Sequence, residues 1–206
     1  MATHLLKRAP DRPRPALEAA PGISLRLARL HEACGPARYT FALWLARQTR
    51  GPVFWIAPDW SAAPLNPDGM ARFAHPGRFT FITPRRPEEL LWTMEETLRA
   101  GIVPLVVADL PGLPALTPVR RLHLAAETGV AETGHAPLGL ILTPDQGGAQ
   151  GVESRWHMAQ SHTADQDAWT LTRLRARTDP QRSWHVTGLP AKPQLSSVEI
   201  PDTQIA

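Results

Sequence analysis

Cysteine, tyrosine and long apolar runs are scarce in this chain of 206 residues. The single cysteine, Cys34, cannot form an internal disulfide, which is typical of proteins in a reducing compartment. No apolar stretch reaches the roughly 18 residues that suggest a membrane-spanning helix. Residues 1–15 are basic but lack the apolar segment of a secretory signal. We therefore expect a soluble, cytoplasmic protein.

Signatures of common catalytic and metal-binding sites are missing as well. The eight histidines are scattered, and His157 and His162 lack the partner set of a zinc site. Neither a Gly-x-Ser-x-Gly elbow nor a cysteine nucleophile motif occurs. The sequence therefore predicts no metal ion and assigns no catalytic residue.

Proline, in contrast, is abundant. The 22 prolines cluster toward the two ends, and residues 1–22 and 189–206 lack a sustained apolar period, which predicts a basic N-terminal tail and a proline-rich C-terminal tail. Residues 23–188 have the length of one domain, and a hydrophobic fraction of 43% suffices for a core. The net charge of +3 is compatible with nucleic acid, an anionic partner or simple solubility.

Short apolar runs alternate with amphipathic segments through this middle part. Strands are predicted at residues 25–34, 52–60, 78–84, 102–109 and 136–144. Helices are predicted at residues 40–50, 66–74, 87–101 and 117–128. This alternation favours an α/β fold with a mostly parallel sheet flanked by helices. Residues 154–161, 168–177 and 183–188 alternate at period two and predict an antiparallel extension of the sheet edge.

The turn between the first strand and the first long helix is where a phosphate-binding loop would lie. Gly35, Pro36, Arg38 and Thr40 occupy it, but the pattern Gly-x-x-x-x-Gly-Lys-Ser/Thr lacks its second glycine and its lysine. Arg38 and Thr40 offer a cation and a hydroxyl, although arginine is larger and planar. An ordinary strand-to-helix turn is the favoured interpretation, and nucleotide binding is the alternative.

Asp109 ends the apolar run Leu-Val-Val-Ala-Asp. A carboxylate at this place would hold Mg²⁺ in the Walker-B position of a nucleotide-binding protein. The same carboxylate could instead cap the Leu-Pro-Gly turn that follows. Because the loop has no lysine, we favour the capping role.

Five arginines lie on or beside the last predicted strands: Arg155, Arg173, Arg175, Arg177 and Arg182. The spacing of Arg173, Arg175 and Arg177 predicts that their side chains leave one face of a strand. Tryptophans interleave with them, and arginine beside aromatic rings can bind phosphates and stack bases. The favoured alternative is a sheet with tryptophan inward and arginine solvated outward.

The segments HEACGPARYTFALWLA, LVVAD and TLTRLRAR, in this order, resemble the ImuA family, RecA-like accessory factors of bacterial mutagenic repair. The similarity spans about residues 25–188. It implies a RecA-type core that works beside an ImuB-like Y-family protein, an error-prone polymerase and RecA, in translesion synthesis within the DNA damage (SOS) response. Gly35, Pro36, Arg38 and Thr40 then fall on the loop positions, and Asp109 on the Walker-B position.

Three hypotheses for function follow. The favoured one is a non-catalytic adaptor without a cofactor, which presents its core surface or its C-terminal tail to partners near DNA, because an α/β core is combined with a degenerate loop. The second is a divergent ATP-binding protein or ATPase that uses Arg38 and Mg²⁺. The third is a basic single-stranded DNA-binding module built on the arginine strands.

Overall fold

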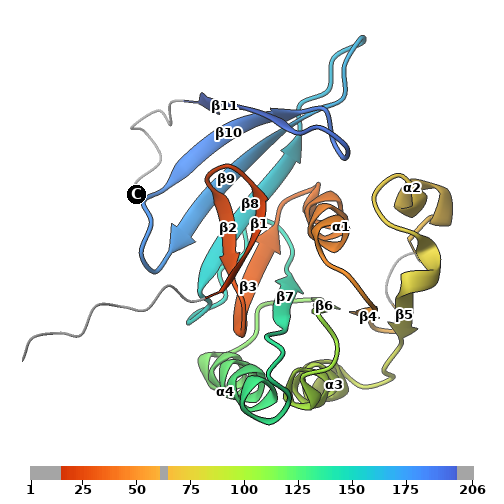
Figure 1. The fold of residues 1–206 in the computed structure, drawn as a ribbon, viewed down its shortest axis with the longest axis vertical. Coiled ribbons are helices and arrows are strands. Elements are labelled where there is room, and N and C mark those ends of the chain that lie inside the picture. The colour runs from red at the N-terminus through yellow and green to blue at the C-terminus, as the bar shows by residue number, and fades with distance from the viewer. Residues whose placement is uncertain (1–14, 61–64, 199–206) are drawn as a thin grey trace, which may run out of the picture.

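The computed structural model describes residues 15–60 and 65–198. Its centre is a nine-stranded, mostly parallel sheet in the order β11-β10-β9-β8-β3-β7-β6-β4-β5 (Figure 1). The parallel part comprises β3 (Arg29–Cys34), β4 (Val53–Ile56), β5 (Phe79–Ile82), β6 (Leu105–Asp109) and β7 (Leu138–Leu142). The remaining strands are β8 (Ser154–Gln160), β9 (Ala168–Ala176), β10 (Arg182–Thr187) and β11 (Gln194–Val198). β8 runs parallel to β3, and the strands beyond it are antiparallel. The predicted mixed α/β fold with an antiparallel extension is thus confirmed.

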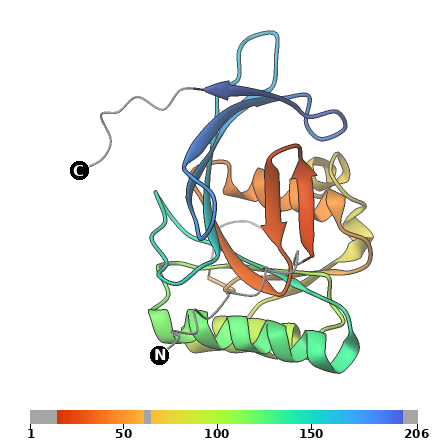
Figure 2. The ribbon, with the colours of Figure 1, turned by 60° about the vertical axis from the view of Figure 1, so that its left-hand side comes forward.

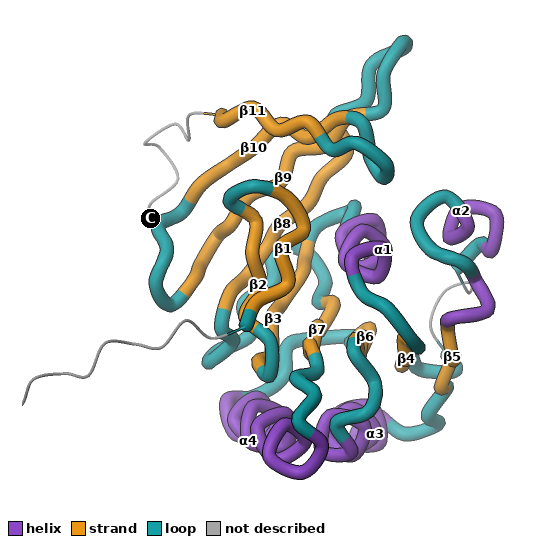
Figure 3. The backbone as a smooth tube through the Cα atoms, viewed as in Figure 1, coloured by secondary structure: helices purple, strands orange, loops and turns teal. Residues whose placement is uncertain are grey.

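Helices cover both faces of the parallel strands (Figure 3). They are α1 (Arg38–Gln48), α2 (Pro67–Ala71), α3 (Pro87–Ala100) and α4 (Leu116–Thr133), with a short 3₁₀ helix, η1 (Pro76–Arg78). Pro87 opens α3 and Gly101, with φ of 68°, ends it, as the sequence predicts. α4 continues past its predicted end to Thr133, and Gly129 lies within it at a close contact: a Cβ there would collide with the Leu98 carbonyl oxygen of α3.

Two apolar layers stabilise the sheet, one on each face. The strand β6 shows how they are built, because successive side chains point to opposite faces. Leu105 and Val107 join the layer that contains α1, whereas Val106 and Ala108 join the layer under α3 and α4. Figure 2 shows α3 and α4 below the sheet and α1 behind the N-terminal hairpin. β6 is therefore buried on both faces, and its last residue, Asp109, lies at the edge where the parallel strands end.

The two predicted tails contain ordered strands. β1 (Ala16–Ala20) pairs with β2 (Ile23–Arg26), and Ile23 and Leu25 are fully buried against the layer of α1. β11 pairs with β10 at the sheet edge. Both expected tails therefore include residues paired in strands, buried in part at β1 and mostly exposed at β11. The remainder of both predicted tails, residues 1–14 and 199–206, lies outside the described residues.

The first predicted strand is divided. β2 and β3 are separate strands, and Ala28, between them, has φ of 55°. This left-handed residue turns the chain, so β2 belongs to the hairpin and β3 to the central sheet.

Among the residues that the structure describes, no helix is both long and apolar enough to span a membrane.

Candidate functional site

The loop between β3 and α1 packs tightly against β8. Gly35 has φ of 86°, a conformation that favours glycine. A Cβ atom at this position would lie 2.6 Å from the Met158 carbonyl oxygen and 2.7 Å from Nε2 of His157. Gly35 is therefore required by the contact with β8, which explains the glycine without any ligand.

Backbone donors of this loop bind protein carbonyl groups. The N–H of Gly35 donates to Asp145 at 2.9 Å, and the N–H of Ala37 donates to Met158 at 2.9 Å. The N–H of Arg38 donates to the carbonyl of Gly35 at 3.2 Å, and Pro36 has no N–H. A phosphate-binding loop needs such N–H groups to face the ligand. This loop is instead closed by its own backbone contacts.

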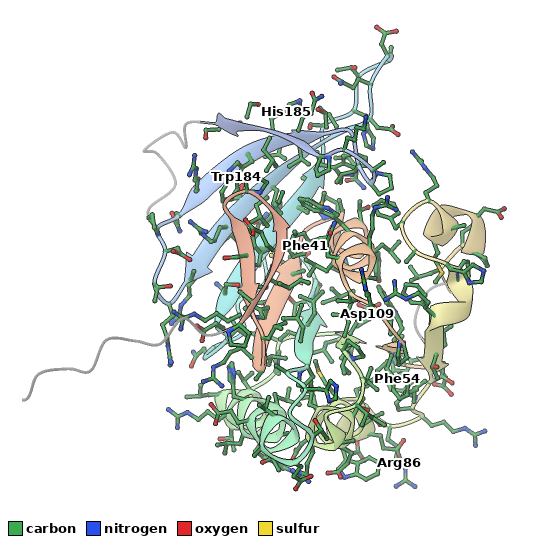
Figure 4. All side chains as sticks on the ribbon, in the orientation of Figure 1. Phe41, Phe54, Arg86, Asp109, Trp184 and His185 are labelled. Atoms are coloured by element: carbon green, nitrogen blue, oxygen red, sulfur yellow. The ribbon has the colours of Figure 1, made fainter. Side chains whose placement is uncertain are left out.

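Arg38 and Asp109, the predicted loop and Walker-B residues, do meet at the carboxyl ends of the strands. Figure 4 shows Asp109 beside α1. Nε of Arg38 lies 3.9 Å from Oδ1 of Asp109, and this nitrogen is buried without a hydrogen bond. The hydroxyl of Tyr39 donates to Oδ2 of Asp109 at 2.7 Å and accepts from Arg38 at 3.1 Å. Tyr39 was not predicted as a site residue, although its place beside Arg38, directly before the predicted helix, was a usable signal.

Burial changes the protonation behaviour of this cluster. It raises the pKa of Asp109 above its ordinary value, against the opposing effects of the Tyr39 hydroxyl and Arg38. It also raises the pKa of Tyr39 to about 12, and the hydrogen bond to Asp109 adds to this effect. The phenol is therefore a permanent donor to the carboxylate near neutral pH. Arg38, Tyr39 and Asp109 together form a polar cluster in which Nε of Arg38 has no hydrogen-bond partner.

A small hollow of about 240 Å³ lies over this cluster. Its walls are formed mainly by prolines and apolar side chains, among them Pro58, Trp60, Pro111 and Pro144. Thr40, the fourth predicted loop residue, lines a different hollow beside α2. The residues present therefore fit a Mg²⁺-nucleotide poorly: N–H groups of the loop are engaged, and Thr40 and Asp109 line different hollows.

Glu32 of β3 anchors the connection between β7 and β8 and was not singled out from the sequence. Its carboxylate is fully buried and accepts from the Thr143 hydroxyl at 2.7 Å and from the N–H groups of Gly148 and Ala149. Nε of Arg155 completes the set at 2.5 Å. A charged residue in an apolar strand was the available signal, because a buried carboxylate needs several donors. Arg155 is thus a structural partner of Glu32.

The predicted single basic face of Arg173, Arg175 and Arg177 is not formed. Arg173 is 7% exposed; its guanidinium lies over the rings of Trp156 and Trp184, and Nε donates to the carbonyl of Pro180 at 3.0 Å. The β8–β9 register advances two residues on β9, from Arg173 to Arg175, for one on β8, so Leu174 forms a bulge. This bulge and the burial of Arg173 separate it from its neighbours.

The other two arginines of this set and Arg182 lie at different places. Arg175 and Arg177 are exposed, and Arg177 follows the end of β9. Arg182 lies over the ring of Trp184, on the opposite side of the β9–β10 turn, and donates to the Ser197 hydroxyl of β11 at 2.7 Å. The five predicted arginines are therefore divided among a buried ion pair, an aromatic stack and separate exposed positions.

Among the described residues, no group of three or more His, Cys, Asp or Glu side chains is arranged to hold a metal ion. No protein-family model and no curated protein sequence matches the chain. Among solved structures, the chain is similar to SulA from Pseudomonas aeruginosa, with a TM-score of 0.44 and 20% sequence identity over 56% of this chain and 98% of that one. A likeness this weak says nothing about the function of the chain.

Proposed function

We propose that the protein is a non-catalytic, RecA-like adaptor of an error-prone DNA damage-tolerance complex, which acts by binding other proteins near DNA. The observation that carries the non-catalytic part is the closed loop after β3. The N–H groups of Gly35 and Ala37 are held by the carbonyl groups of Asp145 and Met158. A loop that must first break these bonds is a poor phosphate site, so the fold serves as a scaffold.

The RecA-like part of the proposal rests on the place of the loop and of Asp109. A glycine turn joins a buried parallel strand to the helix α1, and a second buried strand of the same sheet ends in Asp109. Both lie where α/β sheets usually bind their ligands. The translesion part, with an ImuB-like protein, an error-prone polymerase and RecA as partners, rests on the sequence resemblance to the ImuA family.

The main alternative is a nucleotide-controlled protein in which Arg38 replaces the lysine. Its support is the proximity of Arg38 to Asp109. Against it, the Tyr39 hydroxyl occupies the carboxylate that Mg²⁺ would use. If the alternative holds, Asp109→Asn abolishes Mg²⁺-dependent nucleotide binding; an unchanged binding isotherm for this variant removes it.

Co-elution of purified proteins tests the adaptor function. The full chain is mixed with the ImuB-like protein of the same organism, and complex formation is followed by size-exclusion chromatography with and without nucleotide. We expect a complex that forms equally well in both conditions. A variant that lacks residues 199–206 tests the tail while it retains β11. Failure of the full chain to form any complex contradicts the proposal.

A further inference from the structure

A groove on the side of α4 has the features of a protein-docking site. It measures about 410 Å³ and lies between α4, the start of β3, the residues just before β8 and the residue just after β9. Its lining includes residues from all of these parts: Arg29, Leu116, Arg120, Leu124 and Arg177. In Figures 1 and 2, α4 lies beneath the start of β3, at the end of the molecule away from β10 and β11.

The carboxylates of the groove are already neutralised. Glu127 accepts from Arg29, and Glu153 lies 3.3 Å from Arg26 and 3.9 Å from Arg29. Glu153 is 6% exposed, so this pair belongs to the wall of the groove. The acidic side chains therefore contribute little net charge to a ligand.

Arg120 and Arg177 have no such partner. Both are exposed, and neither forms an ion pair within residues 15–60 and 65–198. Arg121, the neighbour of Arg120, instead bonds Glu95 of α3 at 2.8 Å. The groove thus has two uncompensated positive charges, which come from different elements and face a shared space.

Two leucines lie along α4 on either side of Arg120, four residues before it and four residues after it. Leu124 is 62% exposed. Leu116, two helical turns from Leu124, is half-buried, and a Cβ at Gly151 would lie 2.7 Å from Cδ1 of Leu116. The loop at Gly151 is also fixed, because its carbonyl oxygen lies 3.1 Å from Nε2 of His123. Leu116 is therefore packed against the loop at Gly151.

We propose that this groove binds an acidic peptide segment of a partner protein, with one large apolar side chain against Leu124 and neighbouring carboxylates on Arg120 and Arg177. Charge complementarity supports this occupant. Nucleic acid fits less well, because the exposed Leu124 offers no polar contact to phosphates. The inference rests on the adaptor function proposed above, and it adds the surface and the chemistry of the partner.

Fluorescence anisotropy with short labelled peptides tests the proposal. The probe carries Asp and Glu on both sides of one Leu or Phe, and the control peptides replace the acids by Asn and Gln, or the apolar residue by Ser. We expect saturable binding of the acidic probe, weaker binding of both controls, and loss of affinity as salt is added. Absence of binding, or equal binding of the control peptides, overturns the proposal.

Matched variants locate the binding site. The pair Arg120→Glu and Arg177→Glu is expected to weaken the probe by about tenfold or more, because both charge contacts become repulsive. The pair Arg50→Glu and Arg85→Glu, exposed arginines outside the groove, makes the same change in net charge and should leave affinity unchanged. A lysine-containing version of the probe should recover binding to the first variant pair. Equal losses in both pairs overturn the assignment.

Single-stranded DNA serves as a competitor. If DNA displaces the peptide and binds more tightly, with the same dependence on Arg120 and Arg177, the groove is a nucleic-acid site and the peptide proposal is wrong. If the peptide fails to bind while the chain still forms its complex with the ImuB-like protein, the groove is excluded and the adaptor function stands.

Discussion

The backbone N–H of Ala37 donates a 2.9 Å hydrogen bond to the carbonyl of Met158, which ties the loop after β3 to the strand β8. The second tie, from Gly35 to Asp145, reaches the turn after β7. The N–H groups of Gly35 and Ala37, which could otherwise bind a phosphate, are therefore engaged, and their hydrogen bonds fix the loop from two directions. This arrangement underlies the proposal that the fold acts as a scaffold.

Replacement of Gly35 by alanine should destabilise the protein strongly. The new Cβ meets the Met158 carbonyl oxygen at 2.6 Å, and the backbone has φ of 86°. We expect a loss of about 3 kcal/mol in the free energy of unfolding, measured by urea denaturation. Gly69→Ala is the matched control, because that glycine lies in α2 and a methyl group added there would have no neighbouring atom within 4 Å. Similar stabilities of the two variants would contradict the loop packing.

The ion pair of Glu32 and Arg155 should stabilise the folded protein more than an exposed ion pair does. Glu32→Gln leaves the partly buried Arg155 without its carboxylate, and we expect a loss of about 3 kcal/mol. Glu132→Gln, at an exposed position, should change stability by less than about 0.5 kcal/mol. The double variant Glu32→Gln with Arg155→Met should lose less than the sum of the single changes. Additive losses in this cycle would show that the two side chains are not coupled.

Arg173 should behave as a core residue and not as a ligand-binding one. Arg173→Gln removes the guanidinium from Trp156 and Trp184, and we expect a loss of about 2 kcal/mol in thermal or chemical unfolding. Arg175→Gln, two residues away and exposed, should be nearly neutral. If Arg175→Gln is the more destabilising change, the bulge at Leu174 is misplaced.

Acid should destabilise the fold through His31. This histidine is 1% exposed and bonded to Ser154 at 2.7 Å, and burial lowers its pKa to about 4 from an ordinary value of 6.5. Because the pKa of His31 is lower in the folded state than in the unfolded state, the unfolded chain binds more protons between these two values. The stability that neutral His31 contributes is therefore complete above the ordinary pKa and is lost as pH falls toward about 4. We expect about 2 kcal/mol of this loss between about pH 7 and about pH 5, from urea denaturation at both values.

His31→Gln is the control for this pH effect. The variant starts from a lower stability, but it should lose less between the two pH values than the wild type does. His123 and His157, whose pKa values burial also lowers, remain in both proteins and account for part of the residual loss. Identical pH dependence of the two proteins would exclude His31 as the source.

The periodicity of apolar residues predicted the central strands and helices, because the buried positions there follow a regular pattern along the chain. The run that ends in Asp109 is buried on both faces of the sheet, and the proline and acids at the start of α3 mark its first turn. Gly129 was a poorer signal. Gly129 does not end α4; it lets α4 approach the backbone of Leu98 in α3 closely. Only the packing of the two helices reveals this.

The site was less accessible from sequence, because its features depend on contacts between distant segments. Arg38 and Asp109 lie close together because the turn after β3 and the end of β6 are at the same edge of the sheet. The closure of the loop, in contrast, depends on where Met158 of β8 lies, which the sequence does not show. The equal spacing of the late arginines predicted one face. A single bulged residue, Leu174, changed that outcome.

Calorimetric titration of the purified full chain with Mg²⁺-ATP, and with a non-hydrolysable analogue, tests the central claim most directly. The closed loop predicts no saturable heat at millimolar nucleotide, for the wild type and for Arg38→Ala alike. Saturable binding to the wild type that disappears in Arg38→Ala would contradict the account, because the loop would then open to hold phosphate and the adaptor would be under nucleotide control.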